Sequence, residues 1–531
     1  MSTAQASPFH GDPMPTPATR NRIQRSLALR MELANSDAFA ADPEQIDNGD
    51  EARYPDKCGT YTKGIEQDAI GRVDLAAYQT FRAALDSGNP ADFDSIILGG
   101  PRTLNGPQGG LAFPMECLDS SQFVVPPAPA LASEVYATEL VELYWASLLR
   151  DVAFSDYGSS SVAVMAANEL STLPVYAGPR NSSNQVTTDL LFRGGFPGET
   201  VGPYLSQFLV QDTSMGALPI TQKYITNIPG VDFMLDPTNF QLVQNGQPTP
   251  GQSLTPVASP LYLHDGRGLA AFTHIDVLFQ AYFTAYLVLN TINTGNSPAP
   301  LNPGNPYNGD KTQNGFATLG QPDIAATLAT AASAALKAVW YQKWFVHLRH
   351  RPESGGAIVY LTNTPSAGSV EGKLSPTVLK SQAVKTSFAT NSSYFLSQAF
   401  PEGSPTHPAY PTGHGAVAGA CITILKFFFD GGFVMPTPVV PSSDGKSTTP
   451  YTGPGAGSLT VNGELNKIAH NISFGHGILA GIHWRSDTDT SIQLGEAVAL
   501  SLLRDLAKTY NEKFSVQLQK VDGTTVTISN E

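Results

Sequence analysis

Three long apolar segments in the second half of the chain constrain the fold more than any other feature. They cover residues 323–350, 413–429 and 491–510. Each segment places apolar residues at intervals of three and four, which predicts buried or amphipathic α-helices. Because a helix can bury its apolar face only against another element, we expect these segments to pack together as a helix bundle.

The remainder of the chain is predicted to contain shorter helices joined by long loops. Helical patterns precede the long segments, at residues 21–41, 75–84, 132–153 and 204–210. A further apolar stretch, residues 269–292, contains His274 and Asp276. Since a charge in the middle of a bilayer is costly, we interpret this stretch as a buried core helix rather than a membrane span.

The end of the chain predicts the one β element. Residues 513–529 alternate apolar and polar side chains around Asp522-Gly523, a pair that a type I′ hairpin turn prefers. The predicted fold class is therefore mainly α, a helical bundle with long loops and a small C-terminal β-hairpin. We expect a disordered N-terminus and two helical parts that form one compact unit, with boundaries at residues 1–18, 19–290 and 291–531.

Composition excludes several classes of function. The chain has 31 Lys+Arg and 45 Asp+Glu, a net charge of −14, and it contains no basic run, which argues against nucleic acid as a partner. Only 14% of residues are charged, against roughly 25% in ordinary soluble domains. The N-terminus lacks the apolar core of a secretory signal, so we expect a soluble protein without a membrane segment, and we favour the cytoplasm.

The three cysteines, Cys58, Cys117 and Cys421, match no zinc or iron–sulfur spacing. A single bridge between Cys58 and Cys117 is conceivable, and cysteine counting does not decide it.

Histidines concentrate near the C-terminus, and three local segments there suggest chemistry. In the first segment, Lys343 and Arg351 are a little over two helical turns apart and face roughly the same side. Pro352 disfavours continued helix at Arg351, so this side chain can fold over a ligand that Lys343 also contacts. The alternative is a solvated basic helix end.

The second segment is Pro411-Thr412-Gly413-His414, directly before a long apolar helix. Thr412 is a plausible cap, and the backbone N–H groups around Gly413 would form an anion site of the kind found at helix starts. His414 would stand beside it as an acid or base. The alternative is an ordinary helix entry.

The third segment contains His483 and Asp487, four residues apart and adjacent on a helix. The carboxylate can accept the Nδ1 proton and leave Nε2 free as a ligand or nucleophile. The alternative is a structural His–Asp pair.

In this order and spacing, the three segments resemble the vanadium-dependent haloperoxidases, which share their site with a group of acid phosphatases. The family pattern is a Lys…Arg-Pro motif, a Pro-Ser-Gly-His motif and a Gly-x-His-x-x-x-Asp motif. Glu353, His407 seven residues before His414, and the early stretches 61–66 and 73–79 resemble the bromoperoxidase branch in particular. The resemblance spans residues of about 20 to 510.

The resemblance implies two four-helix bundles that hold vanadate. It implies that His483 Nε2 bonds the metal, that Asp487 orients the ring, and that His414 moves protons. It implies further that Lys343 polarises bound peroxide and that His407 favours bromide or iodide. The residues that it assigns to binding the cofactor are Lys343, Arg351, Thr412, Gly413, His414, His476 and His483.

One position departs from the family pattern. The family's second arginine lies six residues before the anchoring histidine, where this chain has Gly477. His476 lies seven residues before it. Either one residue has been inserted, through a bulged turn, so that His476 takes over this role, or the third cation is absent.

The sequence therefore predicts a vanadate-dependent bromoperoxidase. Its substrates would be hydrogen peroxide, bromide or iodide, and an organic nucleophile, and we expect a homo-oligomer, a dimer or higher. Two alternatives stay open. One is a phosphomonoesterase that forms a phosphohistidine at His483, and the other is a homologue without peroxidase activity because of the change at His476 and Gly477.

Overall fold

The computed structural model describes residues 16–38, 42–68, 70–293, 295–367 and 372–530. The chain divides into two compact units, Met1–Asp42 and Pro43–Glu531. The first unit contains α1 (Arg22–Ala38), as its helical pattern predicts. Residues 1–15 of the segment expected to be disordered lie outside the described residues.

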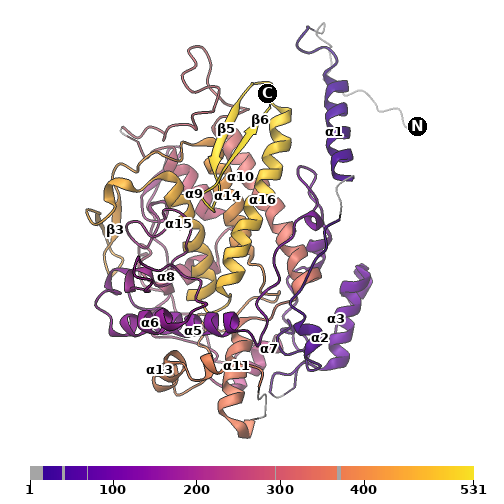
Figure 1. Cartoon of the computed structure of the whole chain (residues 1–531), viewed down its shortest axis with the longest axis vertical. Helices are drawn as coiled ribbons and strands as arrows, with labels where there is room; N and C mark the ends of the chain where they lie inside the picture. Colours follow the sequence, from indigo (N-terminus) through magenta and orange to yellow (C-terminus); the bar gives the residue numbers. More distant parts are fainter. Residues whose placement is uncertain (1–15, 39–41, 69, 294, 368–371, 531) are drawn as a thin grey trace. The chain divides into compact units, whose positions relative to one another are not determined.

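A bundle of long helices forms the centre of the second unit, and it provides the ends on which the site is built. These helices are α10 (Gln321–Tyr341), α14 (Gly413–Phe428), α15 (Val461–Phe474) and α16 (Arg485–Thr509). Helix α14 packs against each of the other three, and α10, α14 and α16 run together in Figure 1. Every residue of α14 is buried, which explains why its sequence is apolar on all sides.

Small residues let α14 and α16 approach closely. A Cβ on Gly419 would lie 1.9 Å from the carbonyl oxygen of Ile492, and a Cβ on Gly495 would lie 1.9 Å from that of Ala416. Any side chain at these two positions would force the helices apart. The contact therefore depends on glycine on both helices.

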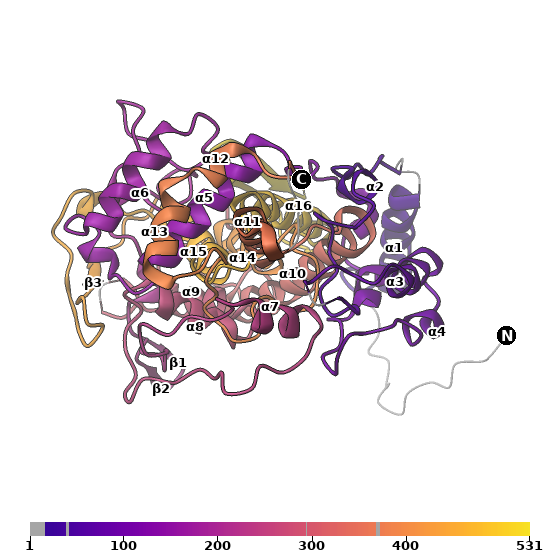
Figure 2. The same cartoon turned by 90° about the horizontal axis from the view of Figure 1, so that it is seen from below.

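A second group of helices surrounds α5 (Glu134–Leu149), on which thirteen residues are buried. Helix α5 packs against α6 (Ser161–Thr172), α11 (Pro352–Asn363), α12 (Pro376–Leu379) and α13 (Gln382–Asn391). Figure 2 shows α5, α6, α12 and α13 grouped together. The other α-helices are α2 (Asp50–Arg53), α3 (Leu75–Ser87), α4 (Pro90–Phe93), α7 (Pro237–Gln244), α8 (Gly266–His274) and α9 (Gln280–Leu289).

Strands are few and short. Three antiparallel pairs occur in the described part of the chain: β1 (Thr213–Met215) with β2 (Leu218–Ile220), β3 (Val439–Pro441) with β4 (Thr448–Pro450), and β5 (Ser515–Gln519) with β6 (Thr525–Ser529). The mainly α fold class and the C-terminal hairpin are confirmed.

Two short segments are π-helices: η6 (Gln342–His347), which continues α10, and η9 (Gly475–Leu479), which continues α15. Short 3₁₀ turns are η1 (Pro107–Leu111), η2 (Ser120–Gln122), η3 (Phe154–Asp156), η4 (Thr188–Leu190), η5 (Gln207–Leu209), η7 (Pro365–Ala367) and η8 (Ala456–Ser458).

Some local predictions are wrong. Residues 269–292 are not one helix, because α8 ends at His274 and α9 begins at Gln280, and Asp276 in the intervening loop turns inward. The helix predicted at residues 204–210 is only the 3₁₀ turn η5. The helix predicted at residues 323–350 forms as α10 up to Tyr341 and continues to His347 as the wider π-turns of η6.

The hairpin turn also differs from the prediction. Gly523 has φ of 86° and donates its N–H to Lys520 O at 3.0 Å, and Lys520 donates to Thr524 O at 2.7 Å. This is a type I turn followed by a left-handed glycine, not a type I′ turn.

The conceivable bridge between Cys58 and Cys117 is not formed, because neither of these cysteines, nor Cys421, takes part in a disulfide. Among the described residues, one stretch, Gln321–His347, is long and apolar enough to cross a membrane by length and composition. Half of its most apolar window is buried inside the protein. Packing against α14 accounts for this apolar character, since core helices pass the same test.

Candidate functional site

His483 lies in the turn between η9 and α16, fully buried. Its Nδ1 is 2.9 Å from Asp487 Oδ2, and its Nε2 is 2.8 Å from Arg351 Nη1. Because a guanidinium only donates, Nε2 accepts this bond and the ring proton resides on Nδ1. Burial and the nearby charges of Arg351 and Lys343 hold the pKa of His483 well below its ordinary value. The ring is therefore neutral, with its lone pair on Nε2.

Asp487 is fixed by several groups, of which Arg349 was not predicted as a site residue. Arg349 Nη1 donates to Asp487 Oδ1 at 2.7 Å, and its Nη2 donates to Glu139 Oε2 at 3.0 Å. Asp487 Oδ2 also accepts the backbone N–H of Trp484 at 3.1 Å. Both carboxylate oxygens are thus occupied, which fixes the orientation of the His483 ring.

A signal for Arg349 exists in the sequence. The segment that leaves η6 is extended and pairs with residues 59–61, and in an extended chain residues two apart point to the same side. Arg349 and Arg351 are two apart, and one contacts Asp487 while the other contacts His483. Because we assumed helical spacing from Lys343 to Arg351, the prediction missed that Arg349 and Arg351 point to the same side.

The two predicted cations, Lys343 and Arg351, converge on one loop. Lys343 Nζ donates to the carbonyl oxygens of Pro408 (2.7 Å) and Ala409 (2.8 Å). Arg351 Nε donates to that of His407 (2.8 Å). Burial lowers the pKa of Lys343 well below its ordinary value, and burial lowers the pKa of Arg351 to about 10. Two buried cations here have backbone carbonyls as partners rather than carboxylates of their own.

His407 faces this cation pair. Its Nδ1 is 3.0 Å from Arg351 Nη2, and its ring centroid lies 4.8 Å from that of Trp340 and 6.5 Å from that of His483. Burial and the neighbouring cations hold the pKa of His407 well below its ordinary value.

The N-terminus of α14 supplies unpaired polar groups. Thr412 is the N-cap residue and is fully buried, yet its hydroxyl makes no capping bond and has no hydrogen-bond partner among the described residues. The first N–H groups of a helix, here from Gly413 onward, lack intrahelical acceptors. Thr412 N–H donates to Asp487 O at 3.1 Å, which ties this helix start to the turn that carries His483.

His414 and His476 stack on each other beside this helix start. Their ring centroids are 3.8 Å apart, and that of His476 is 5.5 Å from that of His483. His414 Nε2 is 3.1 Å from Asp276 Oδ1. In the sequence, Asp276 stands out only as a polar residue in an apolar stretch, so this contact was not predicted.

The π-helix η9 contains His476 and Gly477, two neighbouring residues that both lie close to His483. His476 points to the His483 ring, and its buried Nδ1 finds no partner in the part of the chain that the structure describes. A Cβ on Gly477 would lie 3.0 Å from His483 Cβ, and Gly477 O accepts the N–H groups of Gly481 (3.0 Å) and Ile482 (2.9 Å). A larger residue at 477 would push against His483, so the bulged turn presents residue 476 instead.

Proteins of known family share sequence with this chain over most of its length. Residues 323–512 match the model of the VCPO second helical-bundle domain. The vanadium-dependent bromoperoxidase of Corallina officinalis is 31% identical, over 93% of this chain and 94% of the relative. That of Ascophyllum nodosum is 30% identical, over 90% of this chain and 87% of the relative.

The chain belongs to the vanadium-dependent bromoperoxidase family.

A solved structure supports the same family. The second vanadate-dependent bromoperoxidase of Ascophyllum nodosum, described as homohexameric, superposes with a TM-score of 0.90 at 26% identity. The match covers 99% of this chain and 94% of that one. The family resemblance inferred from the three motifs is therefore confirmed, together with the helical fold.

For this bromoperoxidase-family chain, the donor set fits a small tetrahedral oxyanion such as vanadate. The buried hydroxyl of Thr412 and the buried Nδ1 of His476 lack partners among the described residues, and two buried cations lie opposite the start of α14. Unpaired buried polar groups are costly, so a cluster of them at a helix N-terminus is consistent with a ligand that pairs them.

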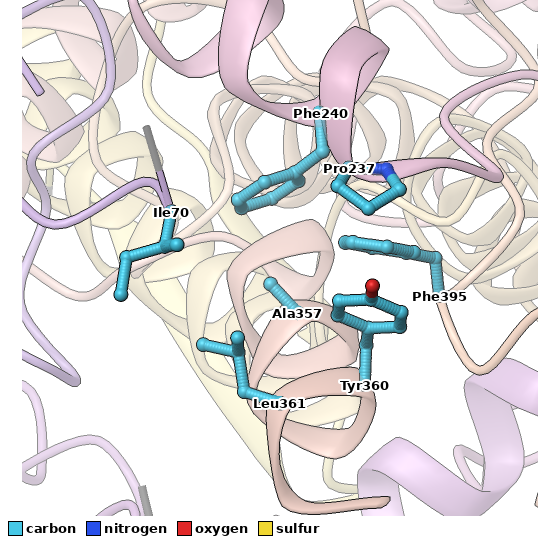
Figure 3. Close-up of a pocket in the computed structure, with 7 residues that line it drawn as sticks. All are labelled: Ile70, Pro237, Phe240, Ala357, Tyr360, Leu361 and Phe395. Carbon is cyan, nitrogen blue, oxygen red and sulfur yellow. The ribbon is translucent and has the colours of Figure 1, made fainter. Parts of the chain in front are cut away.

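An apolar pocket elsewhere does not belong to this site. It holds about 40 Å³, and Figure 3 shows Phe240, Tyr360 and Phe395 converging around it. Since one water occupies roughly 30 Å³ of liquid, the pocket is too small for an organic substrate. None of the predicted site residues lines it.

Proposed function

We propose that this chain is a vanadate-dependent haloperoxidase that oxidises bromide, and also iodide, with hydrogen peroxide to hypohalous acid. The observation that carries the proposal is the buried, neutral His483, whose Nδ1 is paired with Asp487 and whose Nε2 lone pair accepts a hydrogen bond from Arg351 Nη1, so that this lone pair is available to a ligand once Arg351 turns away. Family membership supports a haloperoxidase, and the contacts of His483 support this site for the proposed reaction.

In this proposal His483 Nε2 is the protein ligand of vanadium, and Asp487 orients the ring. Arg351 Nη1 now occupies the Nε2 lone pair at 2.8 Å, so this contact must open when the oxyanion binds. Arg351 would then turn its N–H groups to the oxyanion, together with Lys343 Nζ, the Thr412 hydroxyl and the Gly413 amide. Bound vanadate supplies a Lewis acid that polarises peroxide without changing its oxidation state.

His414 is the proposed acid–base group. Its Nε2 is paired with Asp276 Oδ1, which fixes the ring and leaves Nδ1 to take or give the proton of a reacting oxygen. Lys343, which is buried and donates to two backbone carbonyls, would direct its positive charge to the peroxide substrate, as oxyanion-type stabilisation requires. His407, against Trp340, is the proposed determinant of bromide or iodide preference.

His476 is proposed to take the place of the family's second arginine. A neutral imidazole donates one hydrogen bond, whereas a guanidinium donates two in a fixed fork. Burial and the neighbouring histidines hold the pKa of His476 well below its ordinary value, so it adds no permanent charge to the cradle.

The role of His476 is testable by substitution. We expect His476→Ala to weaken orthovanadate binding roughly 10-fold, the loss of about one hydrogen bond to a charged group. Calorimetric titration with orthovanadate measures it, and His476→Gln, which keeps one donor, is the matched control with a smaller loss. Equal affinity of the alanine variant and the wild type would remove His476 from the cradle.

The activity test uses the purified protein dialysed against chelator. Orthovanadate should restore bromination of a cyclic diketone in the presence of peroxide and bromide, and iodide should replace bromide. Hydrolysis of p-nitrophenyl phosphate is followed in parallel. Hydrolysis alone would favour a phosphomonoesterase that forms a phosphohistidine at His483, and neither activity would favour a homologue that has lost peroxidase function.

Self-association belongs to the same proposal. The solved relative is described as homohexameric, and we propose that this chain also forms a homo-oligomer. The organic nucleophile that accepts the halogen, and the cytoplasmic location, stay predictions.

A further inference from the structure

Thr488, at the start of α16, has a buried hydroxyl that pairs with no group in the described part of the chain. Threonines within helices commonly donate to the carbonyl oxygen four residues back, and Thr423 and Thr362 do so at 2.7 Å. Thr488 makes no such bond. Burial of a hydroxyl without a partner is costly, and a ligand that accepts its hydrogen bond removes that cost.

On one side, the Thr488 hydroxyl faces η9 and the anchoring histidine. A Cβ on Gly477 would lie 3.7 Å from Thr488 Oγ1 and 3.0 Å from His483 Cβ, so both groups lie against the same point of η9. His476, the preceding residue of η9, has its ring centroid 5.5 Å from that of His483. The hydroxyl is therefore a close neighbour of the groups proposed to hold the oxyanion.

On the other side, the face of α16 that carries Thr488 packs against the start of α14. Ser491 is three residues further on the same face, and a Cβ on Gly415 would lie 1.9 Å from Ser491 Oγ and 2.8 Å from Thr412 Cγ2. Thr412 N–H also donates to the carbonyl oxygen of Asp487, the residue before Thr488. The two helix starts are thus in contact, and each contributes a threonine whose buried hydroxyl lacks a partner among the described residues.

We propose that Thr488 is a further binding residue of this site, whose hydroxyl donates a hydrogen bond to an oxygen of the tetrahedral oxyanion at His483. The inference rests on the proposed function, which places vanadate at His483 Nε2. A hydroxyl can rotate to suit an acceptor, and hydrogen bonds to charged acceptors are stronger than those between neutral groups. Binding of the oxyanion would therefore satisfy a donor that the folded chain leaves unpaired.

The other donors of the cradle explain why a neutral hydroxyl at this place matters. Lys343 and Arg351 are its two buried cations. His476 adds no permanent charge, because its pKa lies well below its ordinary value, and a neutral imidazole donates one hydrogen bond. Thr488 would add one more donor beside η9, on the side of the cradle where His476 stands.

A bromide ion is the competing ligand, since a hydroxyl can also donate to a halide. The unpaired buried groups near His483 are three in kind and place: the Thr412 hydroxyl, the Thr488 hydroxyl and the Nδ1 of His476. A ligand with several oxygens can pair more of them at once than a single halide ion can. The observations therefore favour the oxyanion, and halide binding becomes an outcome of the test.

The experiment is a calorimetric titration of the purified full-length protein with orthovanadate. We expect Thr488→Val, which keeps the shape of the side chain and removes the hydroxyl, to weaken binding about 10-fold. Thr488→Ser keeps the hydroxyl and should bind as the wild type does. The matched control is Thr490→Val in the same helix turn, which should leave the affinity unchanged because Thr490 Oγ1 already lies 3.3 Å from the Tyr410 hydroxyl.

Two further measurements separate this role from a structural one and from halide binding. The melting temperature of Thr488→Val should equal that of the wild type, and its KM for bromide at saturating vanadate should be unchanged. Equal orthovanadate affinity of Thr488→Val and the wild type, or an equal loss in Thr490→Val, would overturn the proposal. Equal affinity with a raised KM for bromide would assign the hydroxyl to the halide instead. A wild type that does not bind orthovanadate would refute the proposed function, and this proposal with it.

Discussion

Two buried histidines, His483 and His470, each pair with a carboxylate, yet their surroundings favour opposite protonation states. His483 pairs with Asp487, whose other oxygen is taken by Arg349, and cations surround the ring. His470, on α15, lies between two carboxylates, Glu199 at Nδ1 and Asp489 at Nε2.

The surroundings decide the charge. Coulombic attraction to Glu199 and Asp489 outweighs burial and raises the pKa of His470 to about 9, whereas burial and cations lower that of His483. His470 is a protonated ring with both nitrogens engaged, so it has no lone pair to offer. His483 keeps one lone pair. A His–carboxylate pair therefore identifies a ligand site only when the charges around it are known.

The largest effect that this comparison predicts is at His483. We expect His483→Ala to abolish orthovanadate binding, because it removes the proposed protein ligand of vanadium. Calorimetric titration measures the loss. His470→Gln is the control and should leave the affinity within about threefold, since its ring nitrogens are both engaged. Retained binding in the alanine variant would refute the assignment of His483 as the ligand.

The second prediction concerns Arg349, the cation that pairs with Asp487 beside His483. Arg349→Met leaves Asp487 and Glu139 buried without their partner, so we expect a loss of about 3–5 kcal/mol in the free energy of unfolding. Urea denaturation measures it. Arg82→Met, which breaks partly exposed pairs with Asp86 and Glu51, should cost less, about 1 kcal/mol. Similar losses in both variants would contradict a special role for Arg349.

The third prediction concerns His470, the protonated ring between Glu199 and Asp489. Because its folded pKa of about 9 exceeds the ordinary value of 6.5, His470 contributes stability that is complete below pH 6.5 and is lost as the pH rises through about 9. The contribution is on the order of 3 kcal/mol.

The difference in unfolding free energy between wild type and His470→Gln should therefore shrink between pH 6.5 and 9.5. Taking the difference cancels other groups that titrate in this range, such as Lys63, whose pKa burial lowers to about 8. A difference that does not change with pH would show that His470 is neutral in the folded protein.

The smallest predicted effect is at Thr412, whose N–H donates to Asp487 O but whose hydroxyl has no hydrogen-bond partner among the described residues. Thr412→Val should weaken orthovanadate binding about 10-fold and change stability by less than about 0.5 kcal/mol, because no hydrogen bond of the folded protein is lost. Thr423→Val in the same helix should do the reverse. Its hydroxyl donates to Gly419 O at 2.7 Å, so stability should fall by about 1 kcal/mol with binding unchanged.

The sequence predicted the features that depend on local pattern. Helices α1, α3, α5, α14 and α16 follow from apolar periodicity, and the family follows from three motifs in order. The resemblance carried by these motifs brought Lys343, Arg351, His414 and His483 into one hypothesis. In the structure, Arg351 contacts His483, and both Lys343 and Arg351 donate to the loop before α14.

The partners of these residues could not be predicted, because they come from distant parts of the chain. Asp276 reaches His414 across 138 positions, and Glu139 reaches Arg349 across 210. Tertiary packing sets such contacts, and they produce no periodic pattern in the local sequence from which they could be predicted. The break between α8 and α9 was missed for the same reason, since its loop is held by a contact outside the segment.

The two π-helices have a consequence for reading related sequences. Each absorbs one extra residue within a helix, and each carries a side chain of the site, Lys343 in η6 and His476 in η9. If an arginine stands six residues before the anchoring histidine, as the family resemblance implies, a gapless alignment through η9 sets Gly477 against that arginine and His476 one column earlier. Surveys that classify homologues by that column would count this chain as having lost the position, although the ring of the preceding residue faces His483.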